Sequence, residues 1–338
     1  MNFQQLKYVR AAVRNDLNLT EVANVLYTSQ SGVSKQIKEL ETELGIEIFV
    51  RRGKRLVGLT KAGEGAVRLV ERVLFETENL KRYSKQYTDH DKGRLVIATT
   101  HNQARYVLPR VLHRFAQLYP NVELEIRQGT PKYAGQTVIR GVAEIAVATE
   151  GLDQFSELET HACFSWQHVA VVPPDHPLTR LEAPTLADIA AYPVITYNPE
   201  FSGRSQIDEA FAREGILPDI RLTAMDADVI KTYIEMGMGV GIISEMAMTP
   251  SQKGKLVALP RTHLGFDPCT TKVAFLRGVL LPNYAYHLIE MFAPHLDQAE
   301  LNGTARRRPG KTPPAIIPDF SSRDDLHAIV DVPLIAAE

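Results

Sequence analysis

Residues 98 to 105 read ATTHNQAR and could form a binding site for a small anion. They follow the apolar run RLVIA and precede YVLPRVLHRFAQLY, in which apolar residues recur at helical spacing. A strand-to-helix turn presents free N–H groups and the positive end of the helix dipole to an anion. Thr100 followed by Gln103 also matches a capping box, in which the two side chains satisfy backbone N–H groups at a helix start. The local pattern leaves both interpretations open, and a simple cap is the commoner outcome.

Further neutral hydrogen-bond donors lie elsewhere in this part of the chain. Thr99 directly precedes Thr100, Thr149 ends the run AVAT, and Ser202 lies in FSGRS. Hydroxyl and amide groups beside a helix start suit a small oxyanion or an acetylated amino acid. Because such a site would hold one negative charge without a strong counter-charge, we expect an exchangeable signalling ligand.

The segment TSQSGVSKQIKELETELG, residues 28 to 45, predicts a helix with a DNA-binding face. Val33, Ile37 and Leu40 recur at spacings of 4 and 3, and Gly45 marks the end of the helix. The short helix expected before it, LTEVANVLY with Thr20 as its N-cap, completes a helix-turn-helix pattern. The candidate DNA contacts in this segment are Thr28, Gln30, Ser31, Ser34, Lys35 and Lys38.

Basic residues also cluster in IEIFVRRGKRLVGLT, residues 46 to 60, which predicts two short strands around a turn at residues 52 to 54. A basic hairpin beside a recognition helix makes a winged helix-turn-helix, whose wing reaches phosphates or a minor groove. Residues 1 to 62 carry ten Lys or Arg and six Asp or Glu, or +4, whereas the remainder carries 28 and 34, or −6. This asymmetry places a polyanionic partner at the N-terminal part, although such charges could also be a solvated face. The candidate contacts of the wing are Arg51, Arg52, Lys54 and Arg55.

Thr60 is predicted to cap a long helix that extends to residue 87. The apolar residues of this helix fall at heptad a and d spacing, with Glu76 the one departure. One helix cannot bury such a seam alone, so the pattern favours a dimer; the alternative is a helix that lies on its own domain. The seam consists of Ala66, Leu69, Val73, Leu80, Tyr83 and Tyr87.

From residue 93 onward, strand and helix patterns alternate, which indicates an α/β fold with mostly parallel sheets. We expect two similar halves with a ligand cleft between them. Residues 299 to 338 are rich in Pro, Arg and Ser without periodicity and predict a disordered tail. The expected domains are a winged helix-turn-helix at 1–59, a linker helix at 60–92, an effector domain at 93–298 (subdomain I at 93–163 and 266–298, subdomain II at 164–265), and the tail at 299–338.

Composition and missing motifs narrow the function further. The 338 residues include only Cys163 and Cys269, which excludes a disulfide scaffold, although two thiols could still form a redox switch. No apolar run resembles a signal peptide or a membrane span, so we expect a cytoplasmic protein. The segment GMGVGIIS runs from helix into strand, the reverse of a dinucleotide loop. His161, Cys163 and His168 are weak evidence for a metal. We therefore expect no enzyme activity, no cofactor and no metal.

The segment LTEVANVLYTSQSGVSKQIKELETELGIEIFVRRGKRLVGLTKAG resembles the winged helix-turn-helix of LysR-type transcriptional regulators. The later segments DKGRLVIATTHNQARYVLP, VVPPDHPL, TAMDADVIKTYIEMGMGVGIIS and FAPHL resemble the CysB-like branch of that family, which controls sulfur assimilation and sulfonate use. The resemblance implies two Rossmann-like subdomains related to periplasmic binding proteins. It also implies two chain crossings between them, near Cys163 to Ser165 and near His263 to Asp267.

The same resemblance implies which residues bind the ligand. The pattern of hydroxyl and amide residues lining the cleft of CysB-like proteins is matched by Thr100, Gln103 and Thr149. Trp166 lies just past the first crossing, and Ser202 stands where relatives commonly have Thr. Asn102 departs from the hydroxyl residue expected there, but an amide can still donate to an anion.

The resemblance further implies a transcription regulator, mainly an activator. Its partners would be double-stranded promoter DNA, RNA polymerase and other copies of the chain in a homodimer or homotetramer. Its effector would be a small anion that reports sulfur status: sulfate, thiosulfate, O-acetylserine, N-acetylserine or adenosine phosphosulfate. The alternatives are a LysR-type regulator of another pathway, a thiol redox sensor and, more remotely, a solute-binding protein.

Overall fold

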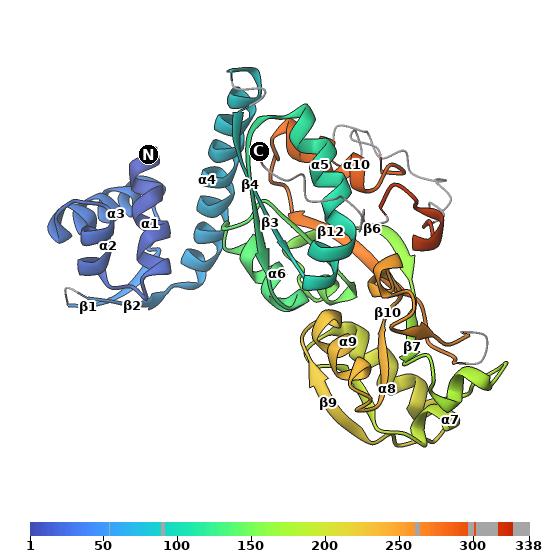
Figure 1. Ribbon diagram of the computed structural model, residues 1–338. Helices are drawn as coiled ribbons and strands as arrows, with labels where there is room; N and C mark the ends of the chain where they lie inside the picture. Colours follow the sequence, from blue (N-terminus) through green and yellow to red (C-terminus); the bar gives the residue numbers. More distant parts are fainter. Residues whose placement is uncertain (54, 89–91, 261–263, 297–300, 302–316, 327–338) are drawn as a thin grey trace, which may run out of the picture. The chain divides into compact units, whose positions relative to one another are not determined.

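The N-terminal part of the chain contains three short helices, a two-stranded hairpin and one long helix (Figure 1). The computed structural model describes residues 1–338 except 54, 89–91, 261–263, 297–300, 302–316 and 327–338, and the side chains of 85–88 are also not described. The chain divides into two units, Met1–Tyr87 and Thr88–Glu338. The elements of the first unit are α1 (Phe3–Arg14), α2 (Leu19–Val25), α3 (Gln30–Leu44), β1 (Phe49–Arg52), β2 (Arg55–Leu59) and α4 (Lys61–Thr88).

The first unit has the winged helix-turn-helix architecture that the sequence predicts. Val33 and Ile37 of α3 are fully buried in its core, as the helical spacing requires. Gly45 ends α3 in the left-handed conformation with φ +67°, also as predicted. The prediction that Thr20 caps α2 is wrong. The N-cap is Asn18, whose side-chain Oδ1 reaches the first turn and accepts hydrogen bonds from the N–H groups of Thr20 and Glu21.

The long helix α4 presents different faces to its own unit and to solvent. Thr60 caps it as expected, since its Oγ1 accepts from the Gly63 N–H at 2.8 Å. Val70 and Leu74 pack into the core of the same unit. One face of the helix therefore lies on its own domain, as the alternative interpretation held.

The predicted heptad seam lies on a more exposed part of α4. Ala66 packs partly against the core, but Leu69 is 60% exposed and Leu80 is 68% exposed. Val73 and Tyr83 are also exposed, and the Tyr87 side chain lies outside the described residues. Exposed leucines at heptad spacing are typical of a helix that pairs with another helix.

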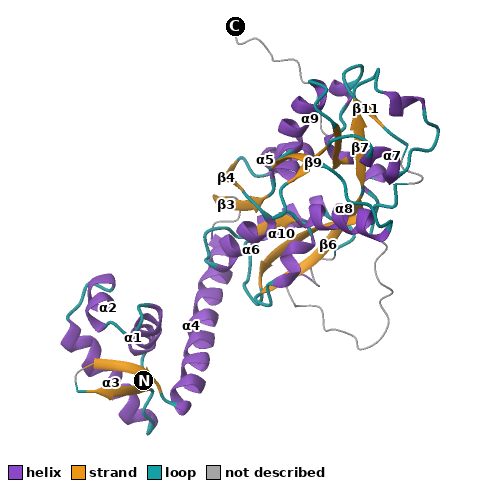
Figure 2. Cartoon of the chain, turned by 90° about the horizontal axis from the view of Figure 1, so that it is seen from below, coloured by secondary structure: helices purple, strands orange, loops and turns teal. Residues whose placement is uncertain are grey.

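The second unit contains two lobes, each built on a five-stranded sheet covered by helices (Figure 2). The first sheet has the order β4-β3-β5-β12-β6 and the second has β11-β7-β10-β8-β9. The first lobe comprises β3 (Lys92–Thr99), α5 (Leu108–Leu118), β4 (Asn121–Gln128), α6 (Pro131–Ile139), β5 (Ile145–Ala148), β6 (Leu158–Trp166), β12 (Cys269–Leu276) and α10 (Asn283–Phe292). The second lobe comprises β7 (His168–Val172), α7 (Leu186–Ala190), β8 (Val194–Tyr197), α8 (Ser202–Arg213), β9 (Ile220–Ala224), α9 (Ala227–Glu235), β10 (Val240–Ser244) and β11 (Val257–Ala258).

The lobes confirm the two α/β halves, but the sheets are mixed rather than mostly parallel. In the first sheet β3 pairs in parallel with β4 and β5, while β12 pairs antiparallel with β5 and β6. The second sheet likewise has two parallel and two antiparallel pairings. The antiparallel strands are those that carry the chain between the lobes, so they do not belong to strand-helix-strand units.

The crossings define the hinge between the lobes. The first was expected near Cys163 to Ser165, but β6 pairs with β12 as far as Trp166, so the chain crosses at Gln167. The return lies between β11 and β12, a stretch that contains the expected region His263 to Asp267; His263 itself is outside the described residues. In the part of the chain that the structure describes, no helix has the length and apolar character needed to cross a membrane.

The turn after β3 is not the capping box that the local pattern of Thr100 and Gln103 matches. Residues Gln103–Val107 form a π turn that leads into α5, and the Gln103 side chain bonds across to Thr271 instead of the helix start. This wider turn lies just before Pro109. Proline has no N–H to donate to the carbonyl four residues back, and in a regular α-helix its ring would clash with that carbonyl, so a wider turn is favoured at this point. Thr100 therefore keeps its hydroxyl free of this cap.

Part of the predicted disordered tail is folded. The N–H of Ser165 donates to the carbonyl of Pro318 at 2.9 Å, and the ring of Phe320 lies 5.6 Å from that of Phe164. Leu326 is fully buried and Arg323 nearly so. The expectation of disorder is wrong for residues 317–326, because a few apolar side chains at irregular spacing suffice to dock a short segment without secondary-structure periodicity.

Candidate functional site

A cavity of about 40 Å³ lies between the two lobes of the second unit. At roughly 10 to 15 Å³ for each water, it has room for about three waters or a small ion. The described residues that line it include no lysine or arginine. They are Thr100, His101, Asn102, Gln103, Thr149, Trp166, His168, Tyr197, Phe201, Gly203, Met225 and Met246.

Five of the seven predicted ligand residues line this cavity: Thr100, Asn102, Gln103, Thr149 and Trp166. Thr99 does not. It is fully buried in β3, and its hydroxyl donates to the carbonyl of Val147 at 2.6 Å. Thr100, the first residue after β3, lines the cavity, while Thr99 is tied into the sheet.

Ser202 is not among the residues that line the cavity. Its hydroxyl shares a hydrogen bond with that of Thr149, which joins the second lobe to the first. Ser202 also lines an outer cleft of about 510 Å³ together with Thr130 and Lys132, and Phe201 borders both spaces. The Thr149–Ser202 bond and the Phe201 ring therefore separate the inner cavity from the outer cleft.

Several polar groups in the cavity have unused hydrogen-bonding capacity. Among the described residues, Thr100 Oγ1 has no hydrogen-bond partner, and the buried Asn102 Oδ1 and Gln103 Oε1 are also unpaired. The amide nitrogens are engaged: Asn102 donates to Tyr197 Oη at 2.9 Å, and Gln103 donates to Thr271 Oγ1 at 2.8 Å. A half-turn of either amide exchanges acceptor for donor without a change of shape. Both amides can therefore adapt to a ligand.

Trp166 contributes its ring to the cavity and not its N–H group. The indole Nε1 donates to Thr271 Oγ1 at 3.1 Å, and the side chain is 4% exposed. This bond fixes the indole as a wall at the end of β6, directly before the hinge. Thr271 was not among the predicted residues, although it orients both Gln103 and Trp166.

His168 is a cavity residue that the sequence reasoning missed as a ligand contact. It is 1% exposed, and burial lowers the pKa of its imidazole to about 3, so the ring is neutral. His161 and Cys163, which with His168 were only weak evidence for a metal, make other contacts: the His161 ring stacks on Phe275, and Cys163 Sγ bonds to the His161 carbonyl. The useful signal was the position of His168 immediately after the hinge.

A second contact between the lobes lies beside the cavity. His101 Nε2 lies 3.0 Å from Asp228 Oδ2, and Tyr106 Oη donates to Asp228 Oδ1 at 2.6 Å. The Lys231 ammonium lies 3.1 Å from the same carboxylate. Burial would raise the pKa of Asp228, but the hydrogen bonds from Tyr106 and His101 and the charge of Lys231 lower it to about 2. We call these four residues, His101, Tyr106, Asp228 and Lys231, the lobe clasp.

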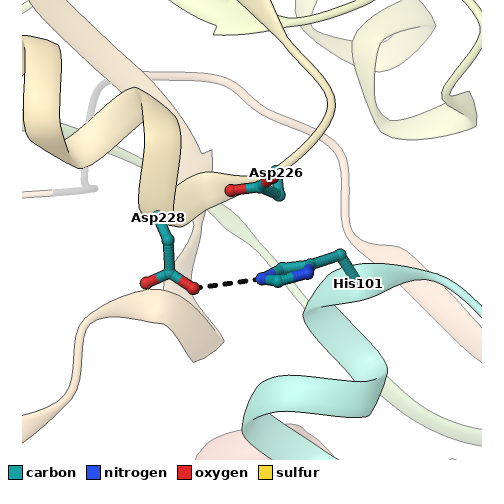
Figure 3. Close-up of side chains that lie close together, drawn as sticks. All are labelled: His101, Asp226 and Asp228. Carbon is teal, nitrogen blue, oxygen red and sulfur yellow. Dashed lines mark hydrogen bonds and ion pairs between the residues drawn. The ribbon is translucent and has the colours of Figure 1, made fainter. Parts of the chain in front are cut away.

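Two residues of the lobe clasp, His101 and Asp228, form with Asp226 a group of side chains that could bind a metal ion. Figure 3 shows His101 facing Asp228, with Asp226 beside them, and their ligand atoms lie within 4.8 Å of one another. However, Asp226 caps α9 by accepting from the Val229 N–H, and Lys231 already neutralises Asp228. The geometry therefore favours an ion-pair network over a cation site.

The predicted DNA contacts of the first unit lie mostly on exposed positions of α3 and the hairpin. Thr28, Gln30, Ser31, Lys35, Lys38, Arg52 and Arg55 are exposed, Ser34 is partly exposed, and Lys54 is outside the described residues. Lys35 forms only a long i,i+4 pair with Glu39, at 3.8 Å.

Arg51 differs from the other basic residues of the wing. Its guanidinium donates at 2.8 Å to Glu41, a buried carboxylate that also accepts from the N–H groups of Ile48 and Phe49. Arg51 therefore braces the hairpin against α3, a structural role that the sequence did not indicate.

Comparisons with known proteins agree with both units. The family described as bacterial regulatory helix-turn-helix protein, lysR family, matches residues 3–64, and the LysR substrate binding domain matches residues 88–297. The chain is 55% identical over 306 residues to the HTH-type transcriptional regulator SsuR of Burkholderia cenocepacia, covering 90% of this chain and 99% of that protein. It is 49% identical over 298 residues to CysB of the same organism, covering 88% and 95%. The crystal structure of the cofactor-binding domain of the Cbl transcriptional regulator matches with a TM-score of 0.61 and 42% identity, covering 63% of this chain and 93% of that one.

Proposed function

The chain belongs to the LysR family of transcriptional regulators, and from this premise we propose that it controls genes of sulfur assimilation, mainly as an activator. The genes in question would serve cysteine biosynthesis or the use of sulfate or sulfonates. The sulfur assignment is supported by 49% identity to a regulator named CysB, the branch that the effector half resembles. The effector would be a small anion that reports sulfur status.

The observation that supports effector binding best is the inner cavity between the lobes. It is lined by neutral hydroxyl, amide and imidazole groups, several of which have unused hydrogen-bonding capacity. Buried polar groups without partners are costly, so a ligand that pairs with them is favoured. The absence of lysine and arginine among the described lining residues suits weak, exchangeable binding of one anion.

Effector binding would act through the arrangement of the two lobes. Some of the bonds that cross between the lobes involve residues that line the cavity, such as Asn102 to Tyr197 and Thr149 to Ser202. A ligand shifts the equilibrium between lobe arrangements only by its different affinity for each. A ligand between these residues is well placed to have such a preference.

The first unit would bind promoter DNA through α3 and the hairpin. Gln30, Ser31 and Lys35 would approach base edges and phosphates, while Arg52 and Arg55 would contact the backbone. Exposed Leu69 and Leu80 support pairing of α4 with the same helix of a second copy, so that a homodimer reads two half-sites. Homotetramer formation and contact with RNA polymerase belong to the same proposal.

The cavity proposal is tested by Thr100→Val in the full-length chain. This variant should keep the fold yet weaken effector binding by at least about 1 kcal/mol, the usual scale of a lost polar contact. Thr99→Val is the matched control, because its hydroxyl is tied to Val147 and should affect stability but not affinity. The effector is first identified by thermal shift with sulfate, thiosulfate, O-acetylserine, N-acetylserine and adenosine phosphosulfate. Equal affinities of Thr100→Val and the unmodified chain in titration calorimetry would remove Thr100 from the site.

The DNA proposal is tested by Lys35→Ala. Loss of one phosphate or base contact should lower operator affinity at moderate salt and reduce the salt slope by about one unit. An unchanged slope would show that α3 does not approach the DNA through this residue.

The geometry disfavours a disulfide-based redox sensor. Cys269 pairs in register with Trp166, three residues along β6 from Cys163, which corresponds to about 10 Å of strand. A disulfide requires Cα atoms within about 7 Å. Burial also raises the pKa of both thiols, which keeps them protonated and unreactive.

A further inference from the structure

One residue of the cavity wall, His168, has a side chain that is held in a fixed plane, unlike the amides of Asn102 and Gln103. His168 Nε2 is buried and has no hydrogen-bond partner in the described part of the chain. The first turn of α8 passes directly over it, so that a Cβ added at Gly203 would lie 2.9 Å from this nitrogen. The Trp166 ring packs against the imidazole in a T-shaped arrangement, with centroids 5.0 Å apart. The imidazole plane is therefore held in place from two sides.

The groups behind His168 determine which ring nitrogen carries the proton. The Cys269 thiol donates to Gln206 Oε1 at 2.6 Å, and its sulfur lies 3.8 Å from His168 Nδ1. With the thiol proton directed to Gln206 Oε1, the sulfur is left to accept from Nδ1, and this arrangement assigns the N–H to Nδ1. The neutral imidazole then carries its lone pair on Nε2, a buried and unpaired atom of a residue that lines the cavity beside Gly203.

We propose that His168 is a specificity-determining residue, whose Nε2 accepts a hydrogen bond from the effector and so selects small anions that carry an O–H or N–H donor. This inference rests on the proposed function, because it specifies the ligand class of the same cavity. An anion without a donor would place an oxygen against the Nε2 lone pair and leave a buried acceptor unpaired. Asn102 and Gln103 can turn their amides toward either kind of ligand, so they do not impose this choice.

Sulfate and hydrogen phosphate are matched probes of this selection. At mildly alkaline pH the two anions share shape and charge, but only hydrogen phosphate has an O–H donor. We expect the full-length chain to bind hydrogen phosphate at least fivefold more tightly than sulfate in titration calorimetry. His168→Phe should bring the ratio near one by removing the acceptor while keeping an aromatic ring. Equal binding of the two anions by the unmodified chain, or tighter binding of sulfate, would overturn the inference.

Two substitutions behind the ring test how the tautomer is held. Cys269→Ser keeps a group that donates to Gln206 and accepts from Nδ1, so it should retain the preference for hydrogen phosphate. Cys269→Ala removes the acceptor for the Nδ1 proton and should reduce the preference. The same loss in both variants would show that Cys269 acts only through packing.

A spectroscopic measurement tests the tautomer without any ligand. Nitrogen-15 spectra of the full-length chain labelled in histidine should show His168 protonated at Nδ1, with its signals assigned from the spectrum of His168→Phe. A proton on Nε2 would overturn the inference whatever the effector is. If the chain bound no small anion at all, the proposed effector class would fail, while this spectrum would still decide the role of His168.

Discussion

Replacing Asp228 by Asn removes the only carboxylate of the lobe clasp and leaves the clasp residues otherwise in place. In the native chain this carboxylate accepts from Tyr106 and His101 and neutralises Lys231, whose side chain is 5% exposed. After the substitution the Lys231 ammonium can still donate to the Tyr106 hydroxyl, the Ala247 carbonyl and the new amide oxygen, but it loses its negatively charged partner. A buried ammonium without a counter-charge is costly, so the second unit should lose stability.

The lowered pKa of Asp228 gives the scale of this loss. A pKa of about 2, against an ordinary 3.8, corresponds to about 2.4 kcal/mol at roughly 1.4 kcal/mol for each unit. Because the Asp228 side chain is 39% exposed, solvent screening reduces this figure, and we expect about 1.5 kcal/mol. For a domain of this size, such a loss lowers Tm by about 3 to 6 °C.

The assay is calorimetric unfolding of Asp228→Asn at neutral pH, with Asp226→Asn as the control. Asp226 only caps α9, and Asn is an equally good cap, so the control should unfold at nearly the native temperature. The pH dependence is a further check. A carboxylate with a lowered pKa stabilises fully above 3.8 and loses its effect as the pH falls toward 2, so the difference between native and Asp228→Asn chains should shrink over that range. Equal losses in both variants, or a difference that persists in acid, would refute the assignment of the clasp.

Three further predictions follow from other parts of the structure. Arg51→Ala should destabilise the first unit by about 1 kcal/mol in chemical denaturation, because the buried Glu41 carboxylate loses the hydrogen bond from the Arg51 guanidinium. Arg52→Ala should leave stability unchanged but lower the salt slope of DNA binding, measured by fluorescence anisotropy. Leu80→Glu should weaken self-association in sedimentation experiments without lowering Tm, since this side chain is 68% exposed in one chain; an unchanged sedimentation coefficient would argue against pairing of α4. Phe320→Ala should lower stability by about 3 kcal/mol through lost packing on Phe164, and a loss below about 0.5 kcal/mol would mean that the segment contributes little.

Periodicity in the sequence was sufficient to predict the elements that bury one face. The spacing of Val33 and Ile37 located α3, and the alternation of apolar strands with amphipathic helices predicted both lobes. The strand β6 was missed because LETHACFSW mixes polar and apolar residues without a clear period. Its partners lie more than a hundred residues away in β12, and such pairing leaves no local signal.

The cavity residues were predictable where they follow a strand, and not where a distant segment selects them. Thr100 and Thr149 both come directly after β3 and β5, so strand ends pointed to them. His101 and Asp228, by contrast, meet across 127 positions of sequence. The fixed tautomer of His168 likewise depends on a cysteine from another strand. Contacts of this kind depend on how the two lobes close, which no short stretch of sequence encodes.

The segment at residues 317–326 has a consequence for how the second unit behaves when it is shortened. It lies against β6, the outermost strand of the first sheet, through the Ser165 to Pro318 hydrogen bond. A strand at the margin of a sheet offers unpaired N–H and C=O groups on which another chain can add a strand. A chain cut at residue 297, where the family match ends, would lose this cover. Such a fragment should be prone to aggregate through β6, and residues 317–326 should then protect solubility in addition to completing the lobe.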